Sequence, residues 1–362
     1  MARDFFMHRP MQRKYATKVA HFTEKGEITM NKTIIFPSAG NVELQDRECP
    51  KPEKGEVLIE TEVSLVSTGT ELTFLNGECP KDSKWSTYIH YPMTPGYSNV
   101  GVVVETGEGV SKEWIGKRVA SFSKHAQYVT AKEEELRVIR YDITSEEAAF
   151  FAIAEVGLNG IRRTKIELGN RVVVYGAGVI GQVLVRYLLA GGCTEIVVVN
   201  RSKKRLEYLP KCPAVIPVSS ETESVMDAVK QVTQGELADI VFETTGNADL
   251  IPEEFKMLHQ QGKLCMLSSP RKETKFDFHD FCNAGSFQII GAHISSQAVT
   301  PSFDDPWTCV RNSEVFFRML STGQMEVDSL ISHRVSYEEA SDIYKEMMKN
   351  RSPYMGVVIR WK

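Results

Sequence analysis

The chain has 362 residues, of which 42% are hydrophobic and 25% charged, and its formal net charge is −4 at pH 7. This length suggests two domains, and the near balance of charge excludes a surface built for nucleic acid or for a membrane. Seven scattered cysteines without a Cys-x-x-Cys pair favour free thiols in a reducing cytoplasm over disulfides. No apolar run is long enough to span a bilayer.

Residues 1–29 show no helical or strand period and lack the apolar segment of a signal peptide. A strand-like run follows directly after Met30. We therefore expect an N-terminal extension over 1–29 whose removal changes stability and cofactor binding little.

From Met30 to about Tyr141 the pattern is one of short strands broken by Pro and Gly turns, which predicts an irregular β-barrel-like domain. A short helix is expected over 72–76, ending at Gly77. The clearest expected strands are 33–36, 57–63, 101–105 and 118–121.

The sequence pattern changes near Thr144, where Ser145 begins a predicted helix with acidic residues in its first turn. Strands and helices then alternate, which is typical of a doubly wound parallel sheet. The expected strands are 171–175, 195–200, 215–218, 239–243, 263–267 and 287–291, and the expected helices are 179–190, 203–209, 222–234 and 251–261. Helices around 312–320 and from Ser336, followed by an apolar strand over 355–361, complete the chain.

The first of these strands runs directly into Gly-x-Gly-x-x-Gly, with glycines at 176, 178 and 181. Gly176 permits a tight turn, Gly178 lets a pyrophosphate approach the backbone, and Gly181 lets the helix pack on the strand. The helix that follows offers its free N–H groups to the phosphates. Because the motif lies between a strand and a helix, it predicts a dinucleotide site rather than a glycine-rich connector.

The second strand ends at Asn200, where a ribose-binding side chain belongs. An acid there would bind the ribose 2′-OH of NAD, whereas Asn200 and the basic run after it favour the 2′-phosphate of NADP. We expect NADP to be preferred and NAD to be the alternative. The expected cofactor contacts are Gly176, Gly178, Val179, Ile180, Gly181, Asn200, Arg201, Ser202, Lys204, Arg205, Thr245, Ser268 and His293.

Several motifs, in order, resemble those of the medium-chain dehydrogenase/reductase family, the alcohol and sorbitol dehydrogenase group. They are the entry strand from Lys51, Pro95-Gly96-Tyr97-Ser98, Gly116-Lys-Arg-Val, the glycine turn and Ser332-His333-Arg334. The resemblance covers residues 30–362. It implies a GroES-like catalytic domain (30–150), a Rossmann domain (151–295), a return to the catalytic domain (296–362), and homodimers or homotetramers joined through the Rossmann sheet near 286–291.

The chain departs from the zinc-dependent members of this family. Where they carry a ligand Cys and a His-Glu pair, this sequence has Thr68 and Tyr97-Ser98. Glu155 is out of register with a further family ligand, and the four-cysteine structural lobe is missing. Zinc is therefore not expected. The Gly-Thr-Glu and Pro-Gly-Tyr runs are similar to those of bacteriochlorophyllide dehydrogenase-like proteins, from which a tetrapyrrole substrate does not follow.

By position in the family, three side chains are candidates for the catalytic site. Thr70 stands where relatives place a hydroxyl beside the substrate oxygen, although it could be a turn hydroxyl. Tyr97 replaces a metal ligand, although it could simply fill the space of the metal. His125 is expected on a strand edge bordering the cleft, although a lone His is more often structural. Glu71 resembles a family acid held by internal hydrogen bonds.

These observations predict a cytoplasmic NAD(P)-dependent oxidoreductase that moves hydride between an alcohol/carbonyl pair and the nicotinamide. Two alternatives remain open at this point. One is a zinc enzyme whose metal is held by unusual ligands such as His125 and Glu155. The other is an NADP(H)-binding sensor or structural protein without turnover.

Overall fold

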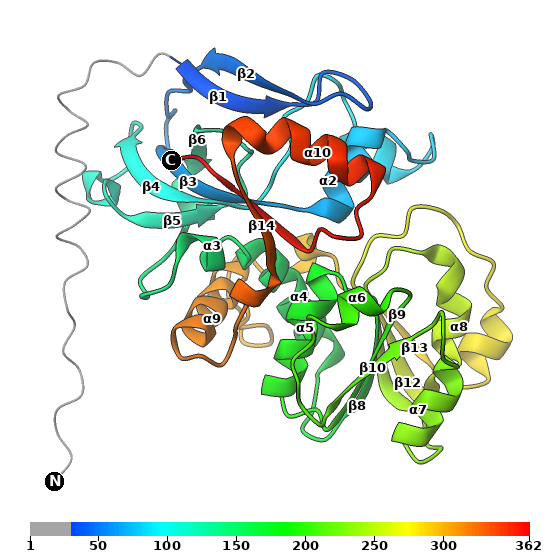
Figure 1. The fold of residues 1–362 in the computed structure, drawn as a ribbon. Helices are drawn as coiled ribbons and strands as arrows, with labels where there is room; N and C mark the ends of the chain where they lie inside the picture. The colour runs from blue at the N-terminus through cyan, green and yellow to red at the C-terminus, as the bar shows by residue number, and fades with distance from the viewer. Residues whose placement is uncertain (1–29) are drawn as a thin grey trace, which may run out of the picture.

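The computed structural model describes residues 30–362, so the predicted extension over 1–29 lies outside the described residues. Two large sheets dominate the described chain, one mainly antiparallel and one fully parallel (Figure 1). No helix within 30–362 combines the length and apolar character that a membrane crossing requires.

The antiparallel part is built around one long strand, β3 (Glu56–Val66). On one side β3 pairs with β4 (Asn99–Thr106), and on the other its first half pairs with β6 (Tyr128–Lys132) and its second half with β15 (Gly356–Arg360). The sheet order is β14-β15-β3-β4-β5-β7, with β5 at Arg118–Ser121, β7 at Arg137–Val138 and β14 at Ile331–Ser336. A separate ribbon pairs β1 (Met30–Ile35) with β2 (Glu43–Glu48).

The parallel sheet has the order β10-β9-β8-β11-β12-β13. Its strands are β8 (Arg171–Tyr175), β9 (Glu195–Asn200), β10 (Val215–Ser219), β11 (Ala238–Glu243), β12 (Leu258–Met266) and β13 (Gln288–Gly291). The strand order reverses between β8 and β11, which is the point where such sheets bind ligands. The predicted α/β fold, a doubly wound sheet beside a GroES-like β domain, is confirmed.

Helices cover both faces of the parallel sheet. Figure 1 shows α4 (Phe151–Thr164) and α5 (Val179–Ala190) on one side, and α7 (Val225–Val232) and α8 (Ile251–Phe255) on the other. The short α6 (Lys203–Leu206) follows β9. Valine-rich strands are buried on both faces, as parallel strands between two helical layers require.

The last part of the chain returns to the antiparallel sheet. The helix α9 (Cys309–Ser321) contributes Phe316 and Phe317 to the core that also contains Phe150 and Phe151. The helix α10 (Ala340–Lys349) lies near α2 (Thr68–Asn76) and buries Tyr344 (Figure 1). The segment after β13 therefore supports the element that carries Thr70. The domain limits at 150 and 295 stay predictions.

One sequence expectation about secondary structure is wrong, and some strands were not anticipated. The helix predicted over 251–261 ends at Phe255, because the chain turns into β12 at Leu258, opposite Ala238 of β11. The expected strands did not include β2, β6, β7 or β14. In β2, most side chains are exposed and there is no apolar alternation. The other predicted elements differ from the observed bounds by a few residues.

Candidate active site

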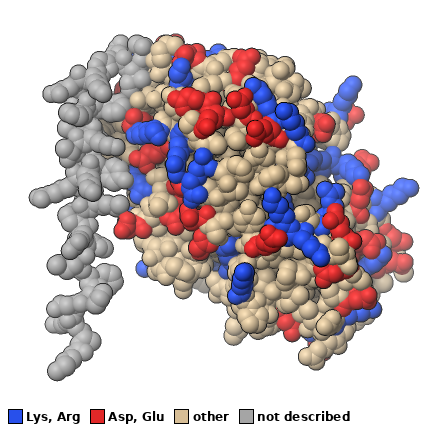
Figure 2. Space-filling model, in the orientation of Figure 1, with Lys and Arg blue, Asp and Glu red and all other residues tan. Residues whose placement is uncertain are grey.

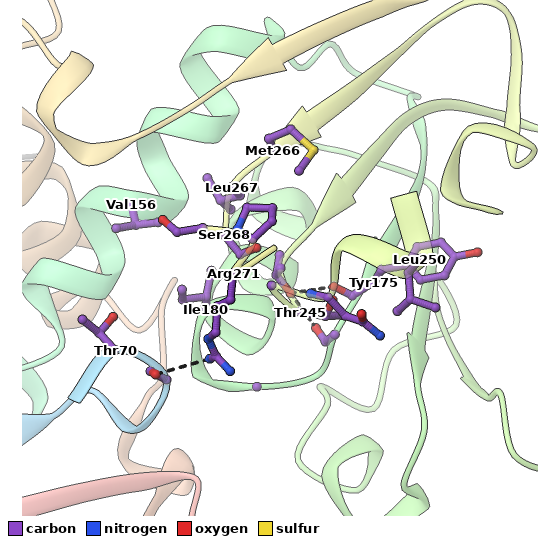
Figure 3. A pocket seen from close by; sticks show the side chains of 18 of the residues that line it. Thr70, Val156, Tyr175, Ile180, Thr245, Leu250, Met266, Leu267, Ser268 and Arg271 are labelled. Atoms are coloured by element: carbon purple, nitrogen blue, oxygen red, sulfur yellow. Dashed lines mark hydrogen bonds between the residues drawn. The ribbon is translucent and has the colours of Figure 1, made fainter. Parts of the chain in front are cut away.

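A cavity of about 1930 Å³ opens at the carboxyl ends of β8 and β11, between the two sheets. The antiparallel part contributes the loop Ser67–Thr70, Tyr97 and Phe122 to its lining. The parallel part contributes the glycine turn, the end of β9 and the loops after β11, β12 and β13. The close-up in Figure 3 shows side chains from these two parts facing one another across the cavity.

The glycine turn is required by the local geometry. Gly176 has φ +105°, and a Cβ there would lie 2.6 Å from Thr244 Oγ1. A Cβ on Gly181 would lie 1.9 Å from the Gly176 carbonyl oxygen. Gly178 is the N-cap of α5, so the unpaired N–H groups of that helix face the cavity beside it. The turn therefore has the form that accommodates a pyrophosphate.

Eleven of the thirteen predicted cofactor residues line the cavity. They are Gly176, Gly178, Val179, Ile180, Asn200, Arg201, Ser202, Arg205, Thr245, Ser268 and His293. Gly181 lies behind the turn, where its role is the close packing described above. Lys204 is exposed and does not line the cavity, so its expected contact with the cofactor stays a prediction.

Asn200 joins the end of β9 to the glycine turn. Its Oδ1 accepts a hydrogen bond from Ala177 N at 3.2 Å, and its Nδ2 donates to Ser202 O at 2.8 Å. Arg201 is exposed beside this corner, 3.7 Å from Glu221. No carboxylate stands at position 200 to repel a phosphate at the cavity wall.

A buried acid that the sequence analysis missed fixes the loops after β11 and β12. Glu243 accepts hydrogen bonds from Thr245 N at 2.6 Å, Gly246 N at 3.0 Å and the Ser268 hydroxyl. Glu243 is fully buried. Thr245 and Ser268 therefore line the cavity with hydroxyls that are already held in place by this carboxylate.

At the other end of the cavity, Thr70 and Tyr97 lie close together. The Tyr97 hydroxyl donates a hydrogen bond to Ser67 Oγ. Removal from water raises the pKa of Tyr97, and the charge of Glu71 adds to this, while hydrogen bonding with Ser67 and Thr70 works in the opposite direction. Tyr97 consequently stays a protonated donor at neutral pH, at the cavity wall beside Thr70.

The expected position of His125 at the edge of the cleft is wrong. Its side chain is 0% exposed and does not line the cavity. Its Nδ1 is 2.8 Å from Ser64 Oγ, and its Nε2 is 3.0 Å from Glu71 Oε2. Such a ring cannot exchange a proton with solvent directly. His125 instead holds Glu71, which accepts from Ser67 N at 2.8 Å and thereby supports the loop of Thr70.

The residues at the family's metal positions do not fit a zinc ion. Thr68 and Tyr97 offer hydroxyls, and the buried Ser98 donates its own to Ala149 O. Glu155 is engaged by Arg137 Nε at 2.8 Å and by the Ser313 hydroxyl at 2.5 Å, and burial raises its pKa although Arg137 partly offsets this. Within 30–362, no three His, Cys, Asp or Glu side chains group as metal ligands. Zinc needs about four such N, S or O donors.

Two further arginines in the cavity wall were missed by the sequence analysis. Arg271 reaches from the loop after β12 to within 3.4 Å of Gly69 O, beside Thr70 (Figure 3). Arg351 lies in the turn before β15 and acts electrostatically on both Arg271 and Arg205. Among the described residues, the guanidinium groups of Arg205, Arg271 and Arg351 form no ion pair with a carboxylate. Only the fold brings these arginines together, since they come from distant segments.

The doubly wound sheet, its glycine turn and the adjoining β domain together define a dinucleotide-binding dehydrogenase. The comparisons with known proteins agree. Residues 53–211 match the model of the alcohol dehydrogenase GroES-like domain, and residues 179–305 match that of zinc-binding dehydrogenases.

Curated relatives carry names from the same group, and a solved structure shares the fold. The (R,R)-butanediol dehydrogenase of Bacillus subtilis is 28% identical, over 59% of this chain and 70% of its own. Sorbitol dehydrogenase 1 of Saccharomyces cerevisiae is 23% identical, over 87% of this chain and 93% of its own. The structure of an E. coli CFT073 alcohol dehydrogenase complexed with NADH superposes with a TM-score of 0.79 at 15% identity, covering 92% of this chain and 100% of its own.

The chain belongs to the alcohol dehydrogenase-like branch of the medium-chain dehydrogenase/reductase family. It is an NAD(P)-dependent oxidoreductase of that class.

Proposed function

We propose that this protein transfers hydride between NADP(H) and an alcohol/carbonyl pair without catalytic zinc. The observation that carries the proposal is the hydroxyl cluster of Ser67, Thr70 and Tyr97. It stands where zinc-dependent relatives, by the sequence resemblance, place metal ligands. Hydrogen-bond donors aimed at a developing oxyanion can take over the electrostatic role of a metal.

The chain's own residues supply the orientation and the proton. The substrate oxygen lies against Thr70 and Tyr97. The Tyr97 hydroxyl turns from Ser67 Oγ to this oxygen, so that both side chains donate hydrogen bonds to it as negative charge develops there. In the reducing direction, the Tyr97 hydroxyl transfers its proton to that oxygen, and the resulting phenolate takes a proton from water through the open cavity, releasing hydroxide to the solvent. When bound, the nicotinamide supplies the hydride in this direction or accepts it in the other.

The preference for NADP rests on the corner around Asn200. The Asn200 amide, bound to Ala177 N and Ser202 O, puts no negative charge at position 200 against a 2′-phosphate. Arg201, which lines the cavity and is exposed, can approach that phosphate. A guanidinium binds phosphate with charge-assisted hydrogen bonds.

The three arginines without carboxylate partners would meet the other phosphates. Arg205 Nη1 is 3.3 Å from the position of a Cβ on Gly178, so this group stands directly over the glycine turn. Burial lowers the pKa of Arg271, and the charge of Arg351 lowers it further. An anion placed between these groups would relieve that repulsion, which is what the pyrophosphate of a dinucleotide supplies.

Assembly and location stay proposals as well. The edge strand β13 is largely exposed, with Ile289 at 47%, and it supports a homodimer or homotetramer that extends the parallel sheet. All seven cysteines are free thiols, which supports a cytoplasmic location. Light scattering of the purified protein decides the first point, because a monomer would contradict it.

The test is an NADPH-oxidation screen across aldehydes, ketones, keto-sugars and enones, run with and without a metal chelator. The proposal expects turnover of at least one carbonyl at a rate that the chelator does not change. Activity that the chelator abolishes and Zn²⁺ restores would contradict the proposal and favour the zinc-dependent alternative. Tight NADPH binding with no turnover of any carbonyl would instead favour the non-catalytic NADP(H)-binding protein.

A further inference from the structure

The wall beyond the hydroxyl cluster is aromatic. Phe74 lies one helical turn after Thr70 in α2, so the two side chains share a face of that helix. Trp85, from the short helical segment Lys84–Tyr88, packs edge to face on Phe74 with ring centroids 5.9 Å apart. Both rings line the cavity, and so does Tyr88 at its exposed rim. The element that presents the reactive hydroxyl therefore continues directly into a surface of rings.

The opposite wall is apolar too. Phe122, after β5, lines the cavity and packs on the buried Phe151 with ring centroids 5.0 Å apart. Ile153 and Val156, from α4, line the same wall. Figure 3 shows Val156 and Thr70 on two separate helices. Phe122 is held from behind by Phe151, so the wall is a fixed surface.

The hydroxyls at this end lie together next to Thr70, whereas the charged side chains of Lys81, Asp82 and Lys84 line the exposed rim beyond Trp85. Ser67, Thr68, Thr70 and Tyr97 lie together on one loop and its neighbour, and Tyr97 already donates to Ser67. One substrate oxygen can be satisfied there. Further hydroxyls of a polyol, held next to that oxygen, would meet Phe74, Phe122 and the aliphatic side chains of α4, and each buried hydroxyl without a partner is costly.

We infer that the substrate is a bulky aromatic alcohol and the product its aldehyde or ketone, or the reverse. The ring system packs on Phe74, Trp85 and Phe122, and the single oxygen lies at Thr70 and Tyr97. This inference rests on the proposed function. In the reducing direction the carbonyl carbon gains the hydride, the oxygen gains the proton, and NADPH becomes NADP⁺, so atoms and electrons balance.

The experiment compares kcat/KM for 2-naphthaldehyde, propanal and glyceraldehyde in the wild type, Trp85→Ala and Phe74→Leu. Losing one apolar wall of a pocket typically costs about 10- to 100-fold in kcat/KM for the substrate that fills it. We expect that loss for 2-naphthaldehyde, little change for propanal, and an unchanged Kd for NADPH. The wild type should prefer 2-naphthaldehyde to glyceraldehyde.

The matched control is Trp114→Ala, because Trp114 lies outside the cavity and is bonded to Glu133 at 2.7 Å. It should leave the ratio between the aldehydes unchanged. A wild type that prefers glyceraldehyde, or a Trp85→Ala variant that loses both substrates equally, overturns the inference while leaving a working oxidoreductase. Absence of turnover with every carbonyl, together with NADPH binding, marks failure of the proposed function instead.

Discussion

The two ends of the cavity are made from different parts of the chain. At the cofactor end, the backbone sets the shape of the cavity. Two glycines lie where a Cβ would collide, and Glu243 anchors the N–H groups of Thr245 and Gly246. At the substrate end side chains decide, through the hydroxyls beside Tyr97 and the ring of Trp85. The backbone geometry at the cofactor end therefore specifies a class of ligand. At the substrate end, a single substitution can change which reaction the site supports.

Buried acids lie behind both ends of the cavity and differ in their surroundings. Burial alone would raise the pKa of Glu71, but the charge and hydrogen bond of His125, with those from Tyr344 and Ser67, bring it below its ordinary value. Glu254 has no hydrogen-bond partner on either oxygen, and burial with the charge of Glu243 raises its pKa to about 9. The loop of Thr70 is thus held by the ionised Glu71, and the cofactor loops are held by the Glu243 carboxylate, next to which Glu254 stays neutral.

The largest effect is expected from Gly181→Ala, which disrupts the glycine turn at the cofactor end. A Cβ 1.9 Å from the Gly176 carbonyl oxygen forces the turn open, so the Kd for NADPH should rise at least about 100-fold. Gly191→Ala, at the other end of α5, has its nearest contact at 3.2 Å and serves as the control. Fluorescence titration measures both, and a folded Gly181→Ala variant with wild-type affinity would contradict the account.

The side-chain end is tested by Tyr97→Phe. Removing one donor to a developing oxyanion typically lowers turnover by about 10²–10³. We expect that drop in kcat with the Kd for NADPH unchanged, measured by steady-state kinetics. Tyr128→Phe removes a phenol hydroxyl outside this cavity and should keep full activity. Full activity in Tyr97→Phe would leave Thr70 as the donor, since His125 is buried.

The cofactor preference is tested by Asn200→Asp. A carboxylate would accept from a ribose 2′-OH and repel a 2′-phosphate, so the ratio of NADH to NADPH affinity should rise by about tenfold or more. Lys204→Ala should change neither affinity, because that side chain does not line the cavity. Titration with both reduced cofactors gives the ratios. A wild type that binds NADH more tightly than NADPH would end the NADP proposal.

The smallest effect is expected from Glu254→Gln. The folded-state pKa of about 9 exceeds the ordinary 4.5, so the folded protein retains a proton that the unfolded chain releases. Stability therefore falls as pH rises across this window. Glutamine stays neutral, so the variant should melt about 2 °C or more above the wild type at pH 8 and closer to it at pH 5. Thermal unfolding scans at pH 5 and pH 8 measure the difference. The same change in melting temperature with pH in the wild type and the variant would contradict this prediction.

The features predicted correctly were those with a local cause. The glycine turn follows from a strand, three glycines and a helix within one short segment, and the positions around Asn200 follow from where β9 ends. The parallel sheet follows from the alternation of its elements. Each of these patterns can be recognised without knowing what packs against it.

What the sequence analysis missed depends on distant contacts. His125 is buried because Glu71 and Ser64 lie on other elements, and Glu71 is also bound by Tyr344, 273 positions away. The chain leaves α8 early because Leu258 pairs with β11. Arg271 and Arg351 join the cavity only through the fold.

The measurement that tests the central claim most directly is elemental analysis of freshly purified, fully active enzyme, combined with its turnover number per chain. Catalysis by the hydroxyls of Thr70 and Tyr97 predicts full turnover with zinc far below one ion per chain. Turnover that rises and falls in proportion to bound zinc, reaching its maximum at one ion per chain, would contradict it.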